Sequence, residues 1–149
     1  MRFSAPFVQR ALALAQDAAR AGEVPVGAVV VSGGRIVGEG MNRTRRDRDP
    51  TAHAEIVAIR AASEALGSHR LVGCDLYVTL EPCAMCAGAI SHARIARLYY
   101  GASDAKGGAI EHGARVFEHP QTLHRPEVHT GLGETESAQL LRTFFRERR

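Results

Sequence analysis

The chain has 149 residues, enough for one domain with a substantial core, and its hydrophobic fraction of 45% is ordinary for a globular protein. No apolar run approaches the roughly 18 residues of a membrane span. Arg10, Gln16 and Asp17 interrupt the first helical stretch, where a signal peptide stays apolar. With a net charge of only +3 and three cysteines, we expect a single domain over residues 1–149 that stays reduced in the cytoplasm.

The N-terminal part of the chain predicts a helix and then a hairpin. Apolar residues recur at helical spacing between residues 6 and 21, which indicates an amphipathic helix that ends near Gly22. The apolar run 26–31 and the segment 35–39 lie on either side of a serine and two glycines. This pattern predicts two antiparallel strands joined by a tight turn.

A second helix is predicted to follow a polar loop. Asp49 and Pro50 are typical of a helix cap and a first helical turn, and the helix is expected to run to about Leu66. His53 and Glu55 would then lie in its first turns.

The next two elements are a strand over residues 75–80 and a helix that begins at Pro82 and runs to about Ser91. That helix carries Cys83 and Cys86. Because a helix N-terminus has a partial positive charge, it lowers the pKa of a thiol and favours the thiolate. A thiolate is the form of cysteine that binds a metal. Because His53 also lies near the start of its helix, we expect a metal ion between the starts of these two helices.

The C-terminal third predicts a strand over residues 97–100, a long loop over 101–133 with a short strand near 127–129, and a last helix over 134–149. Leu141 and Phe145 are expected on one side of this helix, and Arg142, Arg146 and Arg149 on another. Strands that alternate with helices after an initial hairpin indicate an α/β sandwich with a mixed five-stranded sheet.

Three residues have the pattern of a catalytic zinc site. Cys83 and Cys86 are one helical turn apart, so both thiolates can reach a single metal, and His53 supplies a neutral third ligand. Zinc prefers four ligands, so a set of three leaves one position for water, whose pKa falls from about 16 to roughly 7. One zinc ion per chain is expected.

Glu55 is expected to move protons and not to bind the metal. It is two residues from His53, and side chains at that spacing do not share a helix face. A histidine and glutamate two apart, followed by proline, cysteine, two residues and cysteine, form the signature of zinc-dependent nucleobase deaminases.

The cysteines could instead belong to a structural zinc site or a disulfide, but the sequence favours neither. A structural zinc site is usually closed by four protein ligands, and Cys74, the only other cysteine, is read as a buried residue at the entry of a strand. A disulfide between adjacent turns would constrain little. The remaining histidines share no metal-ligand spacing and are assigned no role.

All but Lys106 of the 19 basic residues are arginine, and two groups of them stand out. The groups are Arg43, Arg45, Arg46 and Arg48 in the loop before His53, and Arg142, Arg146, Arg148 and Arg149 at the end. Two basic clusters, one of them near the metal motif in sequence, suit a polyanionic partner. For the loop arginines, a solvated loop without nucleic-acid contact remains an equal alternative.

The chain closely resembles the bacterial tRNA-specific adenosine deaminases of the cytidine deaminase-like superfamily. The similar segments are Glu23–Ala28, Asp49–Glu55, Leu76–Gly88, the loop residues Gly101, Ala102, Asp104 and Lys106, and Phe144–Arg146. Segments 107–113 and 125–129 depart from the family pattern, which weakens any transfer of individual RNA contacts. The resemblance implies a three-layer α/β/α cytidine deaminase-like fold and a homodimer with composite sites.

The resemblance also implies a reaction and a set of contacts. The reaction is the hydrolysis of adenosine to inosine at the wobble position, 34, of a tRNA anticodon. Asn42 is similar to the family residue that binds the target base, Asp104 and Lys106 to residues near the flipped nucleotide, and Phe145 and Arg146 to residues of the final helix. A deaminase of a free base or nucleoside, of the guanine or cytosine type, is the alternative because it shares the zinc set and the fold.

Overall fold

The structure of the chain, a computed structural model, describes residues 4–148. Its strands form one mixed sheet in the order β2-β1-β3-β4-β5. They are β1 (Gly27–Ser32), β2 (Arg35–Met41), β3 (Asp75–Leu80), β4 (Arg97–Ala102) and β5 (Glu127–His129). β1 is antiparallel to β2 and β3, whereas β3, β4 and β5 are parallel. The predicted hairpin and mixed five-stranded sheet are confirmed.

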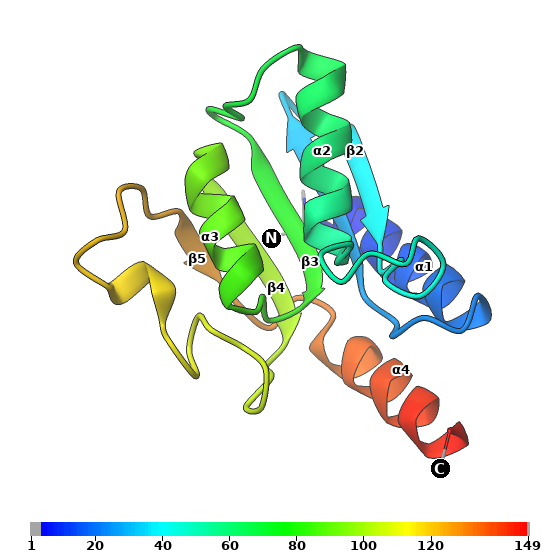
Figure 1. Ribbon diagram of the computed structural model, residues 1–149. Helices are drawn as coiled ribbons and strands as arrows, with labels where there is room; N and C mark the ends of the chain where they lie inside the picture. The colour runs from blue at the N-terminus through cyan, green and yellow to red at the C-terminus, as the bar shows by residue number, and fades with distance from the viewer. Residues whose placement is uncertain (1–3, 149) are drawn as a thin grey trace.

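Helices cover both faces of this sheet. α2 (Ala54–Leu66) and α3 (Ala84–Ala93) lie on one face, and α1 (Ala5–Arg20) and α4 (Glu134–Glu147) on the other (Figure 1). The chain is therefore the three-layer α/β/α sandwich that was expected. None of the helices between Ser4 and Arg148 has the length and hydrophobicity that a bilayer crossing requires.

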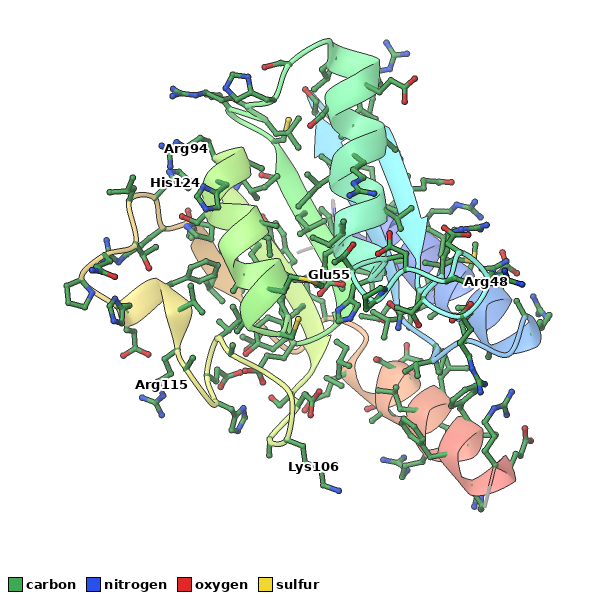
Figure 2. All side chains as sticks on the ribbon, viewed as in Figure 1. Arg48, Glu55, Arg94, Lys106, Arg115 and His124 are labelled. Atoms are coloured by element: carbon green, nitrogen blue, oxygen red, sulfur yellow. The ribbon has the colours of Figure 1, made fainter. Side chains whose placement is uncertain are left out.

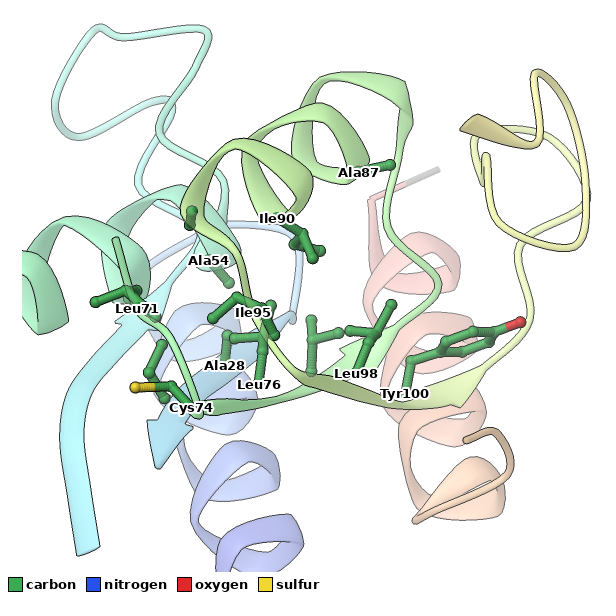
Figure 3. Close-up of a cluster of buried hydrophobic side chains, with 14 of the residues drawn as sticks. Ala28, Ala54, Leu71, Cys74, Leu76, Ala87, Ile90, Ile95, Leu98 and Tyr100 are labelled. Atoms are coloured by element: carbon green, nitrogen blue, oxygen red, sulfur yellow. The ribbon is translucent and has the colours of Figure 1, made fainter. Parts of the chain in front are cut away.

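The central strands are buried on both faces. In β1, Ala28 and Val30 belong to the core under α2 and α3, while Val29 and Val31 belong to the smaller core under α1. Successive side chains of a strand point to opposite faces, so this strand must be apolar at every position. That requirement explains its continuous apolar run. Figure 3 shows the larger core, where Ile90 of α3 lies over the strands.

α2 begins later than the sequence pattern predicted. Its N-cap is His53, and Asp49 closes a turn instead, because Asp49 Oδ1 accepts hydrogen bonds from the Thr51 N–H at 2.9 Å and the Thr51 hydroxyl at 2.6 Å. The first helical N–H, that of Ala54, donates to Asn42 Oδ1 at 2.8 Å. A side chain from another segment therefore supplies the cap that Asp49 was expected to supply.

Two further differences concern the later helices. α3 begins at Ala84 with Cys83 as its N-cap, so Pro82 precedes the helix and does not open it. In α4, Phe144 is the buried ring and Phe145 is 51% exposed. Leu141 and Phe145 lie on one side as expected, but Arg142 and Arg146 line the same surface depression instead of a separate side. Arg149 lies outside the described residues.

α2 packs unusually close to β2. A methyl group on Gly38 would lie 2.6 Å from the Ala62 nitrogen, and one on Gly40 would lie 2.6 Å from the Ala58 nitrogen. The opposing atoms belong to a helix backbone, so they cannot move individually. Glycine on the strand and alanine on the helix therefore set the depth at which α2 sits on the sheet.

We expect Gly40→Ala to destabilise the fold by about 1–3 kcal/mol, because overpacking forces the backbone to shift. Gly88→Ala in α3 is the matched control, since a methyl group there meets nothing within 4 Å. It should stabilise the helix by about 0.5–1 kcal/mol. Urea unfolding of both variants measures the difference, and equal stabilities would show that the close contact does not limit α2.

Candidate metal centre and active site

His53, Cys83 and Cys86 meet where α2 and α3 begin. His53 and Cys83 are the N-caps of the two helices, and Cys86 lies one turn into α3. Their ligand atoms all lie within 4.8 Å of one another, although some thirty positions separate the histidine from the cysteines. The expected position between two helix starts is therefore confirmed.

The spacing of these atoms fits a zinc ion. Cys83 Sγ lies 3.5 Å and Cys86 Sγ 3.6 Å from His53 Nδ1. Tetrahedral zinc, with Zn–S of about 2.3 Å and Zn–N of about 2.0–2.1 Å, separates a sulfur from a nitrogen by roughly 3.6 Å. No fourth His, Cys, Asp or Glu from residues 4–148 belongs to the group. A set of three ligands is typical of a catalytic site, which keeps one position open.

The two thiols are electrostatically unequal in the protein alone. The pKa of Cys83 is lowered to about 4, and the largest cause is a hydrogen bond from Cys86. A hydrogen bond from His53 also lowers it. The pairing of the two thiols, together with burial and the nearby Glu55, raises the pKa of Cys86. A bound dication removes this conflict, because it deprotonates any thiol that coordinates it.

Glu55 lies beside this group but is not part of it. It is only 4% exposed, and Figure 2 shows it between α2 and α3. Burial is the main reason that its pKa rises to about 7. A carboxyl group with a pKa near the working pH can both accept and release a proton, which is the requirement for a general acid and base.

Asn42 is held by the protein at both ends of its amide. Its Oδ1 accepts from the Ala54 N–H, and its Nδ2 donates to the Val24 carbonyl at 3.1 Å. One amide hydrogen and one lone pair of the side chain remain for another partner. Asn42 is therefore held in a fixed orientation at the start of α2, the helix that carries Glu55.

The loop after β4 carries two more of the expected substrate residues. Asp104 Oδ1 accepts hydrogen bonds from the N–H groups of Lys106 and Gly107, at 3.1 and 3.0 Å, and so closes a turn within the loop. Lys106 extends away from the molecule (Figure 2).

Phe145 and Arg146 line a surface depression of about 410 Å³ together with Leu141 and Arg142. The apolar ring and the two guanidinium groups thus share one face of α4. This combination suits a nucleic acid, which presents both bases and phosphates.

The loop arginines are partly engaged inside the protein. Arg43 pairs with Asp47 at 3.0 Å, and Arg46 lies 3.6 Å from the buried Glu23. Arg45 and Arg48 are exposed, and Arg48 has a positive φ of 50°. The loop therefore has a defined conformation, and not all of its arginines are free for a polyanion.

A family model described as the cytidine and deoxycytidylate deaminase zinc-binding region matches residues 1–102, which include all three metal-binding side chains and Glu55. The chain belongs to this deaminase family. Membership explains why the motif carries an open zinc site, since deaminases of this family are zinc-dependent hydrolases.

Three relatives show where the chain lies within the deaminase family. The tRNA-specific adenosine deaminase of Agrobacterium fabrum is 59% identical over 96% of this chain and 94% of its own. A solved structure of a tRNA A34 deaminase superposes with a TM-score of 0.90 at 58% identity, over 91% of this chain and 98% of the other. Guanine deaminase from Bacillus subtilis is 36% identical, with a TM-score of 0.66 over 96% and 92% of the two chains.

Two buried carboxylates were not singled out from the sequence. Glu23 and Glu81 are 1% and 2% exposed, and each accepts hydrogen bonds from a loop beside the site. The available signal was a charged residue directly beside apolar ones, such as Glu81 between Leu80 and Pro82. Such residues are rarely buried unless they are paired.

The donor set predicts one zinc per chain in metal analysis of the purified protein. Cys83→Ser, Cys86→Ser or His53→Ala should each lower the zinc content sharply, because two ligands bind zinc weakly. Cys74→Ala is the matched control, since Cys74 is buried but lies outside the group. Full zinc in a Cys83→Ser, Cys86→Ser double variant contradicts the assignment.

Proposed function

We propose that this chain hydrolyses adenosine to inosine at the wobble position, 34, of a tRNA anticodon. The observation that carries the proposal is the near full-length match, at 59% identity, to a protein named tRNA-specific adenosine deaminase. The open three-ligand site and the neighbouring buried glutamate supply the chemistry that this reaction needs.

In this proposal His53, Cys83 and Cys86 hold the zinc, which, when bound, activates a water molecule at neutral pH. The carboxylate of Glu55 accepts a proton from the attacking water and donates it to adenine N1, beside the attacked C6. Glu55 then takes the remaining proton from the hydroxyl group on C6 and delivers it to the departing amino group. Water adds, ammonia leaves, and the C6 carbonyl of inosine remains.

The proposed contacts to RNA come from three segments. Asn42 uses its free amide positions to bind the target base, while Asp104 and Lys106 contact the flipped nucleotide and its neighbours. Phe145 offers an exposed ring for stacking, and Arg146 offers a charge for phosphate. An anticodon loop suits this arrangement, because its bases are already unpaired and cost little to extrude.

We further propose that residues 1–149 act as one deaminase domain, in the cytoplasm and as a homodimer with composite sites. The resemblance to the tRNA-specific adenosine deaminases supports the dimer. Sedimentation equilibrium of the zinc-loaded protein tests it: a mass of two chains is expected, and a mass of one chain at micromolar concentration contradicts it.

A free-base deaminase is the second candidate, favoured by the 36% identity to guanine deaminase from Bacillus subtilis. A single assay separates the two candidates. The purified protein is incubated with a tRNA anticodon stem-loop, with guanine and with cytidine, and inosine and ammonia are measured. Inosine in the stem-loop alone is expected, whereas efficient turnover of guanine or cytidine with none of the stem-loop overturns the proposed substrate.

Glu55→Gln should reduce turnover by on the order of 100-fold or more, because the amide can neither accept nor return the proton. Zinc content and circular dichroism should match the unsubstituted protein. The control is Glu64→Gln, a carboxylate on the exposed end of the same helix. Loss of zinc from Glu55→Gln would instead make Glu55 a ligand, and near-normal turnover would remove it from the reaction.

Binding of the stem-loop should weaken steeply as salt rises, since each neutralised phosphate releases counterions. Arg146→Gln should lower the slope of log K against log salt by about 0.7, the value for one contact to a single strand. Arg97→Gln is the matched control: this arginine pairs with Asp75 at the amino end of β4, away from the site. Equal slopes for both variants would exclude Arg146 from phosphate binding.

A further inference from the structure

Glu81 is a buried carboxylate that follows β3 and precedes the metal-binding Cys83 by two positions. Its side chain is 0% exposed. Burying an unpaired charge is costly, so a carboxylate in this position needs several hydrogen-bond donors. The donors identify the part of the structure that depends on it.

Every side-chain partner of Glu81 comes from the loop after β4. Oε1 accepts from the Asp104 N–H at 2.9 Å and faces His112 Nδ1 at 2.8 Å. Oε2 accepts from the N–H groups of Ile110, Glu111 and His112, at 3.1, 2.9 and 3.1 Å. These hydrogen bonds from Asp104 at one end and from residues 110–112 at the other show that the carboxylate gathers both ends of the segment 104–112.

The same loop lies against the segment that leads into the metal centre. The Ala109 N–H donates to the Pro82 carbonyl at 2.8 Å, and the Glu81 N–H donates to the Ala102 carbonyl at 2.8 Å. A methyl group on Gly108 would lie 2.6 Å from Glu81 Oε2, so the loop backbone passes directly over the carboxylate. Asp104 and Lys106 are thus held at the edge of the site by Glu81.

Glu23 repeats this arrangement on the other side of the site. It is 1% exposed, and its Oε1 accepts from the Arg45 N–H at 3.2 Å and the Thr44 hydroxyl at 3.5 Å. Its Oε2 accepts from the Arg46 N–H at 2.8 Å. These donors all belong to the arginine loop between Asn42 and His53.

We propose that Glu23 and Glu81 are positioning residues that hold the two loops beside the site, residues 43–48 and 104–112, in the shape that receives the substrate. The proposal rests on the proposed function for the identity of the substrate. Neither carboxylate contacts the substrate or the metal; each acts through the loop whose amides it binds. Loss of either carboxylate should therefore raise KM for the RNA and leave the zinc content unchanged.

The first test measures the loops directly, by amide hydrogen exchange of the zinc-loaded full chain. Glu81→Gln should speed exchange at the amides of 104 and 110–112 and leave those of 45 and 46 unchanged, because an amide side chain replaces an acceptor with a donor. Glu23→Gln should do the reverse, so each variant controls for the other. Glu118→Gln, whose side chain is 65% exposed, should alter neither loop.

The second test measures deamination of the anticodon stem-loop. Each glutamine variant should raise KM about tenfold, the loss expected from one hydrogen bond to a charged group, while kcat stays within about twofold. A general structural defect would lower kcat and the zinc content together. Unchanged exchange, or a wild-type KM despite faster exchange, overturns the positioning role.

The outcomes separate this proposal from the proposed function. If the unsubstituted protein does not deaminate the stem-loop, the proposed function fails, and faster loop exchange in the variants leaves only a structural role for the carboxylates. If a glutamine variant does not fold, His112→Ala and Thr44→Val each remove one side-chain donor and test the same hydrogen bonds. They should produce smaller increases in exchange within the same loops, and unchanged exchange in both overturns the proposal.

Discussion

The metal centre depends on how closely α2 approaches the sheet. His53 is the N-cap of that helix, and the sulfurs come from the start of α3 on the same face of the sheet. A displacement of α2 by the size of a methyl group is much larger than the tolerance of a zinc ligand distance, which is roughly 0.2 Å. The glycines of β2 and the alanines of α2 remove that methyl group, so the backbone contact sets where His53 Nδ1 stands relative to the sulfurs.

Burial produces two different results for carboxylates in this protein. Glu55 has few donors around it, so desolvation dominates and its pKa rises to about 7. Glu81 is equally buried but accepts several backbone hydrogen bonds, and its pKa falls. Hydrogen-bond donors therefore lower the pKa of one buried glutamate, while burial with few donors raises the pKa of the other.

The comparisons indicate where specificity lies. A tRNA A34 deaminase and a guanine deaminase both share the sandwich with this chain, with TM-scores of 0.90 and 0.66. Zinc chemistry is common to base deamination, so the metal site by itself cannot distinguish an anticodon from a free base. The loops around the site and α4 lie outside this shared chemistry. In the loops 43–48 and 104–112, buried carboxylates accept hydrogen bonds from the N–H groups of residues 45, 46, 104 and 110–112.

The sequence by itself determined the elements whose pattern is local. Continuous apolar runs predicted the central strands, including the bounds of 75–80, and the spacing of the histidine, glutamate and cysteines indicated the metal set. The tertiary structure decided what depends on contacts between distant segments. It placed the start of α2 at Ala54, because Asn42 caps it, and it decided that Phe144 is buried while Phe145 is exposed. It also identified Glu23 and Glu81, whose partners lie more than twenty positions away, since a buried charge becomes tolerable only when folding brings its donors together.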